Sequence, residues 1–204
     1  MEIKNSNLSI GLLIISYYYI NGDEFMILIE KFKENDIDLL ERWKKIYEIE
    51  SDINLSIFTR NDKKHWVEKI NKCADCKYFI INNCGIKIGI ININHLDNEG
   101  GILEYYIGDV HFRGRNLTEA ILWNIYNYIF DDLQIKYVVT NILENDKRNI
   151  NTHLNMGCEI KGRFKEGKYK NEKIKDIIYV LMKKEKWNNI KGEFDYKEIL
   201  IEKI

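Results

Sequence analysis

The sequence contains no proline, and no proline-rich linker or internal repeat divides its 204 residues. Charge of one sign is not in excess either, because 31 basic and 32 acidic residues leave a formal net charge of −1. A broad basic surface is the usual mark of a nucleic-acid-binding protein, so this balance argues against nucleic acid as a partner. With 45% hydrophobic residues, the chain is long enough to bury the core of a single domain.

Long hydrophobic runs are scarce as well. The apolar run near the N-terminus, Leu8–Ile20, is shorter than the ~20 residues that span a bilayer. One lysine and one glutamate precede it in place of a basic segment, and no small-residue cleavage site follows it. We therefore expect an extra strand or packed appendage there, a cytoplasmic protein and no membrane partner. A signal peptide and a membrane anchor are the alternatives.

Cysteine is also infrequent, and the four residues are Cys73, Cys76, Cys84 and Cys158. Cys73 and Cys76 have zinc-knuckle spacing, but no second pair follows to complete a site with four ligands. We expect unpaired cytosolic thiols and no metal, with a redox pair or a metal site as the alternative.

Apolar runs separated by turn residues predict the secondary structure. The expected strands are 25–31, 78–81, 86–93, 102–107, 135–143, 159–169 and 174–183, and the expected helices are 35–47, 61–73, 117–130 and 146–156. Consecutive hairpins come first and strand–helix–strand units later. This order predicts an α/β fold with a mixed, mostly antiparallel central sheet of about six or seven strands, flanked by about four helices.

The junction between strand 102–107 and helix 117–130 suggests chemistry. A helix N-terminus carries unpaired N–H groups and about half a positive charge, so it favours a phosphate. Arg113 and Arg115 add positive charge there, and Gly114 lets the backbone approach a ligand closely. The alternative is an ordinary connection with two solvated arginines, because one glycine in a basic loop is a weak motif.

From this strand to Met182, the sequence resembles the GNAT (GCN5-related N-acetyltransferase) family. In that family a strand leads into Arg/Gln-x-x-Gly-x-Gly/Ala, whose backbone amides hold the pyrophosphate of acetyl-CoA. The matching run here is Arg113–Thr118, with Asn116 and Thr118 at the two small positions. The resemblance implies acetyl-CoA as cosubstrate and no metal. The cofactor-binding residues that it implies are Ile107, Gly108, Arg113, Gly114, Arg115, Asn116, Leu117, Thr118 and Asp146.

A second family pattern, Asn-x-x-Ala-x-x-x-Tyr-x-x-x-Gly-Phe, is similar to Asp146–Cys158. The family's tyrosine, which protonates the leaving CoA thiolate, corresponds to His153 here. Ile150, His153, Leu154 and Gly157 have helical spacing, so His153 is expected on the face toward the sheet. An imidazole with a reference pKa of ~6.5 can donate a proton near neutrality. A packed core histidine without catalytic duty is the alternative.

Glu104 is the carboxylate inside strand 102–107. Alternation places it on one face with Ile102 and Tyr106. A carboxylate among apolar neighbours either faces a substrate cleft or carries a desolvation penalty. We therefore expect Glu104 to act as the general base or to recognise the substrate amine.

The acceptor is suggested by resemblance alone. The run 106–109 and the ending 176–187 resemble acetyltransferases of UDP-linked amino sugars, such as the enzyme of pseudaminic acid biosynthesis. Acetyltransferases of protein N-termini and of polyamines share this layout, and a non-catalytic binding module of the same fold is a further alternative. We expect an N-terminal extension (1–24), an acetyltransferase domain (25–187) and a C-terminal tail (188–204) that is a surface helix, with a homodimer as the possible assembly.

Overall fold

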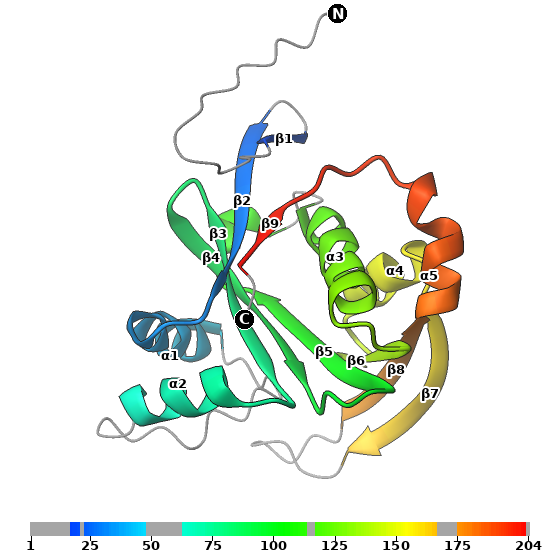
Figure 1. The fold of residues 1–204 in the computed structure, drawn as a ribbon, viewed down its shortest axis with the longest axis horizontal. Helices are drawn as coiled ribbons and strands as arrows, with labels where there is room; N and C mark the ends of the chain where they lie inside the picture. The colour runs from blue at the N-terminus through cyan, green and yellow to red at the C-terminus, as the bar shows by residue number, and fades with distance from the viewer. Residues whose placement is uncertain (1–16, 21–22, 48–62, 114–116, 167–174, 203–204) are drawn as a thin grey trace, which may run out of the picture.

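The computed structural model describes residues 17–20, 23–47, 63–113, 117–166 and 175–202 (Figure 1). Within these ranges no helix has the length and apolar character needed to cross a membrane. The strands are β1 (Tyr17–Ile20), β2 (Asp23–Lys31), β3 (Lys77–Asn83), β4 (Ile86–Asn94), β5 (Gly100–Ile107), β6 (Tyr137–Leu143), β7 (Glu159–Glu166), β8 (Lys175–Lys183) and β9 (Leu200–Ile201). The helices are α1 (Ile37–Tyr47), α2 (Lys63–Lys72), α3 (Leu117–Asn127), α4 (Lys147–Asn155) and α5 (Lys184–Ile190).

All nine strands belong to one sheet, with the order β1-β2-β3-β4-β5-β6-β8-β7 and with β9 beside β2. The mixed, mostly antiparallel α/β fold is confirmed, but the sheet has more strands than the sequence suggested. Strand β1 lies within Leu8–Ile20, where an extra strand was one of the expected alternatives, whereas β9 was not expected; both are short and pair with β2. Strand β9 has two residues, too few for an alternating pattern to mark it.

The sheet has a different helical layer on each face (Figure 1). On one face α1 and α2 pack through Trp43, Val67 and Ile70 against inward-facing residues such as Ile80 and Ile90. On the other face α3, α4 and α5 cover a larger core. Side chains therefore alternate between two apolar interiors along β3 and β4, which explains why these strands are rich in isoleucine on both faces.

The C-terminal tail contributes more than the expected surface helix. Trp187 of α5 is fully buried, and its indole N–H donates to Asn127 Oδ1 at 2.8 Å. Buried Asn124 of α3 then holds the following segment, because its Nδ2 donates to the Lys197 carbonyl at 3.0 Å and its Oδ1 accepts from the Ile199 N–H at 2.7 Å. The tail crosses α3 in this way and ends as β9, parallel to β2.

Helix α3 ends differently from the expectation. The sequence predicted one helix to residue 130, but the α-helix stops at Asn127 and continues as a π-helical turn, Tyr128–Asp132. The apolar residues Tyr128, Ile129 and Phe130 are all buried. Apolar spacing alone does not distinguish an α-helical turn from a π-helical one, because both carry buried side chains.

Candidate active site

Strands β5 and β6 run parallel, and they separate. Their pairing covers three residues on each strand, from Gly100 opposite Tyr137 to Ile102 opposite Val139. Beyond that point β5 continues beside β4 as far as Ile107, while β6 continues beside β8. The two strands thus form a fork in the described part of the sheet. Beyond Ile102 and Val139, the backbone N–H and C=O groups on the facing edges of the two strands point into the fork. We call this feature the strand fork.

A cavity of about 310 Å³ lies where the strand fork meets the starts of α3 and α4. The lining residues are Tyr105, Tyr106, Ile107, Arg113, Thr118, Asp146, Arg148, Asn149 and Thr152. They come from β5, from the loop after it and from the first turns of the two helices. Two arginines and a helix start at one cavity make a site suited to an anion.

Four of the expected cofactor-binding residues, Ile107, Arg113, Thr118 and Asp146, line this cavity together. Leu117 does not, because its side chain is 1% exposed and packs in the core under α3. Residues 114–116, which include the expected Gly114, Arg115 and Asn116, lie outside the described residues.

Gly108 follows β5 directly, and it is held by packing on the opposite face. Its N–H donates to the Ile88 carbonyl at 2.8 Å. A Cβ atom at this position would come within 2.1 Å of the Trp43 indole. Glycine at 108 therefore lets α1 approach the end of β5.

Arg113 is held in place by neighbours on β5. Its Nε donates to the Ile107 carbonyl at 2.8 Å, and its Nη2 donates to the Tyr106 hydroxyl. The guanidinium carbon also lies 4.9 Å from the centre of the Tyr106 ring. These contacts fix the arginine in the cavity lining, where its positive charge attracts an anionic ligand.

The sequence analysis missed the α4 residues of the cavity. Arg148, Asn149 and Thr152 line it from the first turns of α4, and Asp146 caps that helix by accepting from the Asn149 N–H at 3.1 Å. Asn149 Oδ1 accepts from the Tyr105 hydroxyl at 2.5 Å, which joins β5 to α4. The helical spacing of 148, 149 and 152 is a signal that these side chains share a face, but it does not say that this face meets β5.

His153 lies deeper than the cavity lining. Its side chain is 0% exposed, and Nδ1 is 2.8 Å from the Tyr126 hydroxyl, which in turn lies 3.2 Å from Cys158 Sγ. Burial lowers the pKa of His153 to about 3, so the imidazole is neutral at pH 7. Nε2 is buried and has no hydrogen-bond partner among the described residues. The expected placement toward the sheet is thus correct for His153, although Leu154 of the same stripe is 38% exposed.

The neutral state of His153 bears on its expected role. A neutral imidazole is a weaker acid than the protonated ring considered from the sequence, so the environment resembles that of a packed core histidine. The Tyr105 ring lies 5.7 Å from the imidazole, between centres, and is itself part of the cavity lining. The acid role of His153 stays a prediction.

Glu104 lies on the face of the sheet that α1 and α2 cover, as alternation predicted. Its Oε2 accepts from Asn92 Nδ2 at 2.6 Å and from Asn94 Nδ2 at 3.0 Å. Asn92 sits directly opposite Glu104 in the antiparallel register, and its side chain is 0% exposed. Two amide donors hold the carboxylate in one orientation.

The strand fork places a second polar side chain near Glu104. Ile102 and Val139 are the last paired residues, so Glu104 and Asn141 are the next residues on this face, one on each arm of the fork. The Oδ1 atoms of Asn92 and Asn141 are buried and have no hydrogen-bond partner among the described residues. The arrangement offers acceptor oxygens beside a carboxylate, which suits an ammonium or amine group.

The strand fork thus has a cavity with basic groups and, outside that cavity, a carboxylate. A match to a protein family adds to this geometry. Residues 27–159 match the family model described as "Acetyltransferase (GNAT) domain". Because this match covers more than half of the chain, the protein belongs to the GNAT acetyltransferase family. The enzyme class expected from the sequence, an N-acetyltransferase, is confirmed, and enzymes of this family use acetyl-CoA. A search of curated proteins finds no match.

Solved structures share the fold at low sequence identity. Spermidine N-acetyltransferase from Vibrio cholerae in complex with CoA and spermine has a TM-score of 0.69 and 12% identity, over 80% of this chain and 98% of that chain. A dodecameric structure of the same enzyme has a TM-score of 0.69 and 11% identity, over 80% and 96%. A protein described as a probable acetyltransferase has a TM-score of 0.65 and 18% identity, over 79% and 94%.

Proposed function

We propose that this protein transfers the acetyl group of acetyl-CoA to a primary amine by direct attack, and that the amine belongs to a nucleotide-linked amino sugar. The observation that carries the proposal is the strand fork. It has the cavity lined by Arg113 and Arg148 at its open end and, on its β5 arm, the Glu104 carboxylate, which does not line that cavity. A thioester entering from one face and an amine entering from the other would meet between the strands.

The cavity lining fits the phosphates of acetyl-CoA. Arg113 and Arg148 supply positive charge, and the Thr118 hydroxyl lies in the first turn of α3, where the backbone N–H groups are unpaired. Asp146 directs its carboxylate to the start of α4, where the Asn149 N–H neutralises part of its charge. Phosphate oxygens would therefore meet donors rather than a competing carboxylate.

The proton chemistry is assigned to two residues. Acetyl-CoA supplies a thioester carbonyl that an amine can attack. In our proposal Glu104, oriented by Asn92 and Asn94, accepts the proton of the attacking amine. His153 would give its Nε2 proton to the departing thiolate while Nδ1 takes the proton of the Tyr126 hydroxyl, so the ring stays neutral throughout the step.

The acceptor class rests on two different kinds of support. The run 106–109 and the ending 176–187 favour an amino sugar, whereas a structural neighbour was solved with spermine, which favours a polyamine. Protein N-termini are the third candidate. A homodimer is part of the proposal, and a dodecameric neighbour supports the view that this fold assembles.

Isothermal titration with acetyl-CoA tests the cofactor, and no heat at millimolar ligand would reject the enzyme proposal in favour of a non-catalytic module. The acceptor is tested by measuring free thiol release with UDP-amino sugars, polyamines and N-terminal peptides in parallel. We expect turnover with an amino sugar. Turnover with peptides or polyamines alone would reject this acceptor while leaving the acetyltransferase intact.

A further inference from the structure

The turn that joins α2 to β3 brings three potential metal ligands together. The Sγ atoms of Cys73 and Cys76 and a carboxylate oxygen of Asp75 all lie within 4.8 Å of one another. Cys73 Sγ donates to Asp75 Oδ1 at 2.6 Å. All three side chains are at least partly accessible, so an ion can reach them from solvent.

The turn is held at both ends by hydrogen bonds, so these donors are preorganised. The Cys73 N–H donates to the Ile70 carbonyl at 3.3 Å, and Cys76 Sγ contacts the same carbonyl at 3.8 Å. The Asp75 carbonyl accepts from the Leu96 N–H at 2.9 Å, which fastens the turn to the loop between β4 and β5. A preformed cluster loses little conformational freedom when it binds an ion.

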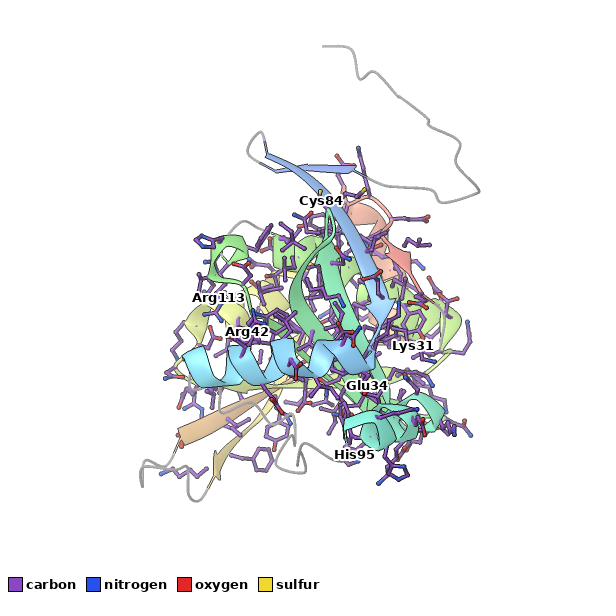
Figure 2. The ribbon with its side chains drawn as sticks, turned by 90° about the vertical axis from the view of Figure 1, so that its left-hand side faces the viewer. Lys31, Glu34, Arg42, Cys84, His95 and Arg113 are labelled. Atoms are coloured by element: carbon purple, nitrogen blue, oxygen red, sulfur yellow. The ribbon has the colours of Figure 1, made fainter. Side chains whose placement is uncertain are left out.

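His95 of that loop is the candidate for a fourth donor, although its ring nitrogens are not among the ligand atoms that lie within 4.8 Å of one another. It precedes Leu96 and adopts a left-handed backbone with φ of 51°, which is uncommon for residues other than glycine. The hydrogen bond from the Leu96 N–H to the Asp75 carbonyl holds the backbone of His95 beside the turn, so its side chain can turn toward the carboxylate when a metal binds. Figure 2 shows His95 at the end of the molecule that carries α2, whereas Cys84 lies at the opposite end.

We propose that Cys73, Asp75, Cys76 and His95 form a binding site for a thiophilic divalent metal, with Zn²⁺ as the ion that suits the donors. Two sulfur atoms with one nitrogen and one oxygen are a donor set for tetrahedral zinc and not for magnesium or calcium. The sequence analysis expected no metal because it looked for a second cysteine pair. The missing ligands come instead from inside the Cys-x-x-Cys turn and from a neighbouring loop.

Metal binding would connect α2 to the loop after β4. Val67 and Ile70 anchor α2 in the core beside β3, and the end of the helix is held by the Asn71 hydrogen bond to the Phe32 carbonyl and by the turn at 73–76. A bound ion would fix this end with bonds that do not depend on acetyl-CoA. The site is therefore structural in our proposal and separate from the cavity at the strand fork.

Titration of the reduced, full-length protein with Co²⁺ tests the proposal, because thiolate-to-cobalt charge transfer absorbs in the near ultraviolet. We expect one equivalent of Co²⁺ to bind with this band, and Zn²⁺ to displace it. Cys73→Ser and Cys76→Ser should each reduce the band and weaken binding by roughly 100-fold or more. Loss of a direct metal ligand should cost at least as much affinity as loss of a residue that hydrogen-bonds to a ligand. Asp75→Asn and His95→Ala should keep the band and weaken binding by roughly 10-fold.

Cys84→Ser is the matched control, because Cys84 is an exposed cysteine far from the turn, and it should bind Co²⁺ like the parent protein. Binding without the charge-transfer band, or equal binding by Cys73→Ser and the parent, would overturn the site. A Cys73–Cys76 disulfide in untreated protein, with no Co²⁺ binding after reduction, would also overturn it. Titration with acetyl-CoA is independent of all these outcomes, so this proposal and the proposed function fail separately.

Discussion

Replacement of Glu104 by glutamine tests the catalytic proposal most directly. Both described hydrogen bonds of the carboxylate, from Asn92 and Asn94, go to the same oxygen, Oε2. The carbonyl oxygen of glutamine can accept both, so Glu104→Gln retains these two hydrogen bonds and removes the base. The variant should therefore fold like the parent protein, with a melting temperature within about 2 °C, since a change below 0.5 kcal/mol is typical of a well-accommodated substitution.

The expected loss of activity follows from the role of a general base. Such a base contributes about 10²- to 10⁴-fold, which is about 3 to 5 kcal/mol of transition-state stabilisation. We expect kcat with the best acceptor to fall by this factor, while acetyl-CoA binds with unchanged affinity because Glu104 does not line the cavity. The deficit should shrink as the pH rises, because a larger fraction of the acceptor is then already the free amine.

The assay is thiol release over a range of pH, together with isothermal titration of acetyl-CoA. Glu99→Gln is the control, because Glu99 is an exposed carboxylate that pairs with Lys136 at 2.5 Å on the surface. If Glu104→Gln retains activity within threefold of Glu99→Gln at every pH, Glu104 is not the base. A large loss that does not depend on pH would assign it to amine recognition instead.

Three further predictions concern His153 and Gly108. His153→Ala should slow turnover while His153→Tyr retains it, and the acid role is wrong if steady-state rates of both match the parent protein. Because burial lowers the pKa of His153 to about 3, below the ~6.5 of an unfolded chain, the unfolded state binds a proton that the folded state excludes. The free energy of unfolding should thus fall as the pH drops from ~6.5 toward 3, and urea titrations should show a weaker fall for His153→Tyr; equal slopes would contradict the assigned burial. Gly108→Ala should cost about 1 to 3 kcal/mol in urea unfolding, because its Cβ would overlap Trp43 at 2.1 Å. Gly192→Ala, with no atom within 4 Å of the new Cβ, should leave stability nearly unchanged, and similar losses in the two variants would refute the packing explanation.

The sequence predicted the fold well where local pattern and tertiary environment agree. The ends of strands β3, β4 and β5 were predicted to within a few residues, because isoleucine-rich runs bounded by asparagine and glycine strongly favour β-strands. The failures have a common cause, which is that the conformation depends on the tertiary environment and not on the local sequence pattern. Strand β9 has two residues and depends on β2 for its conformation, and the turn Tyr128–Asp132 is π-helical although its composition suits an α-helix.

The candidate site was predictable only in part for a similar reason. The residues that follow β5 were found because a strand, a basic loop and a helix start are consecutive in sequence. Arg148 and Asn149 reach the same cavity from another helix, and only the three-dimensional arrangement of α4 against β5 brings them there. The partners of Glu104 were also missed, because Asn92 and Asn94 become neighbours through the register of β4 on β5. A contact set by register cannot be inferred from spacing in one strand.

The position of β9 has a consequence for how the molecule is made. Because Leu200 and Ile201 pair with Leu28 and Ile29, strand β2 acquires this neighbour only after the strands β3 to β8 have been synthesised. Until then the β2 edge is exposed to solvent, and an unpaired edge can associate with other chains.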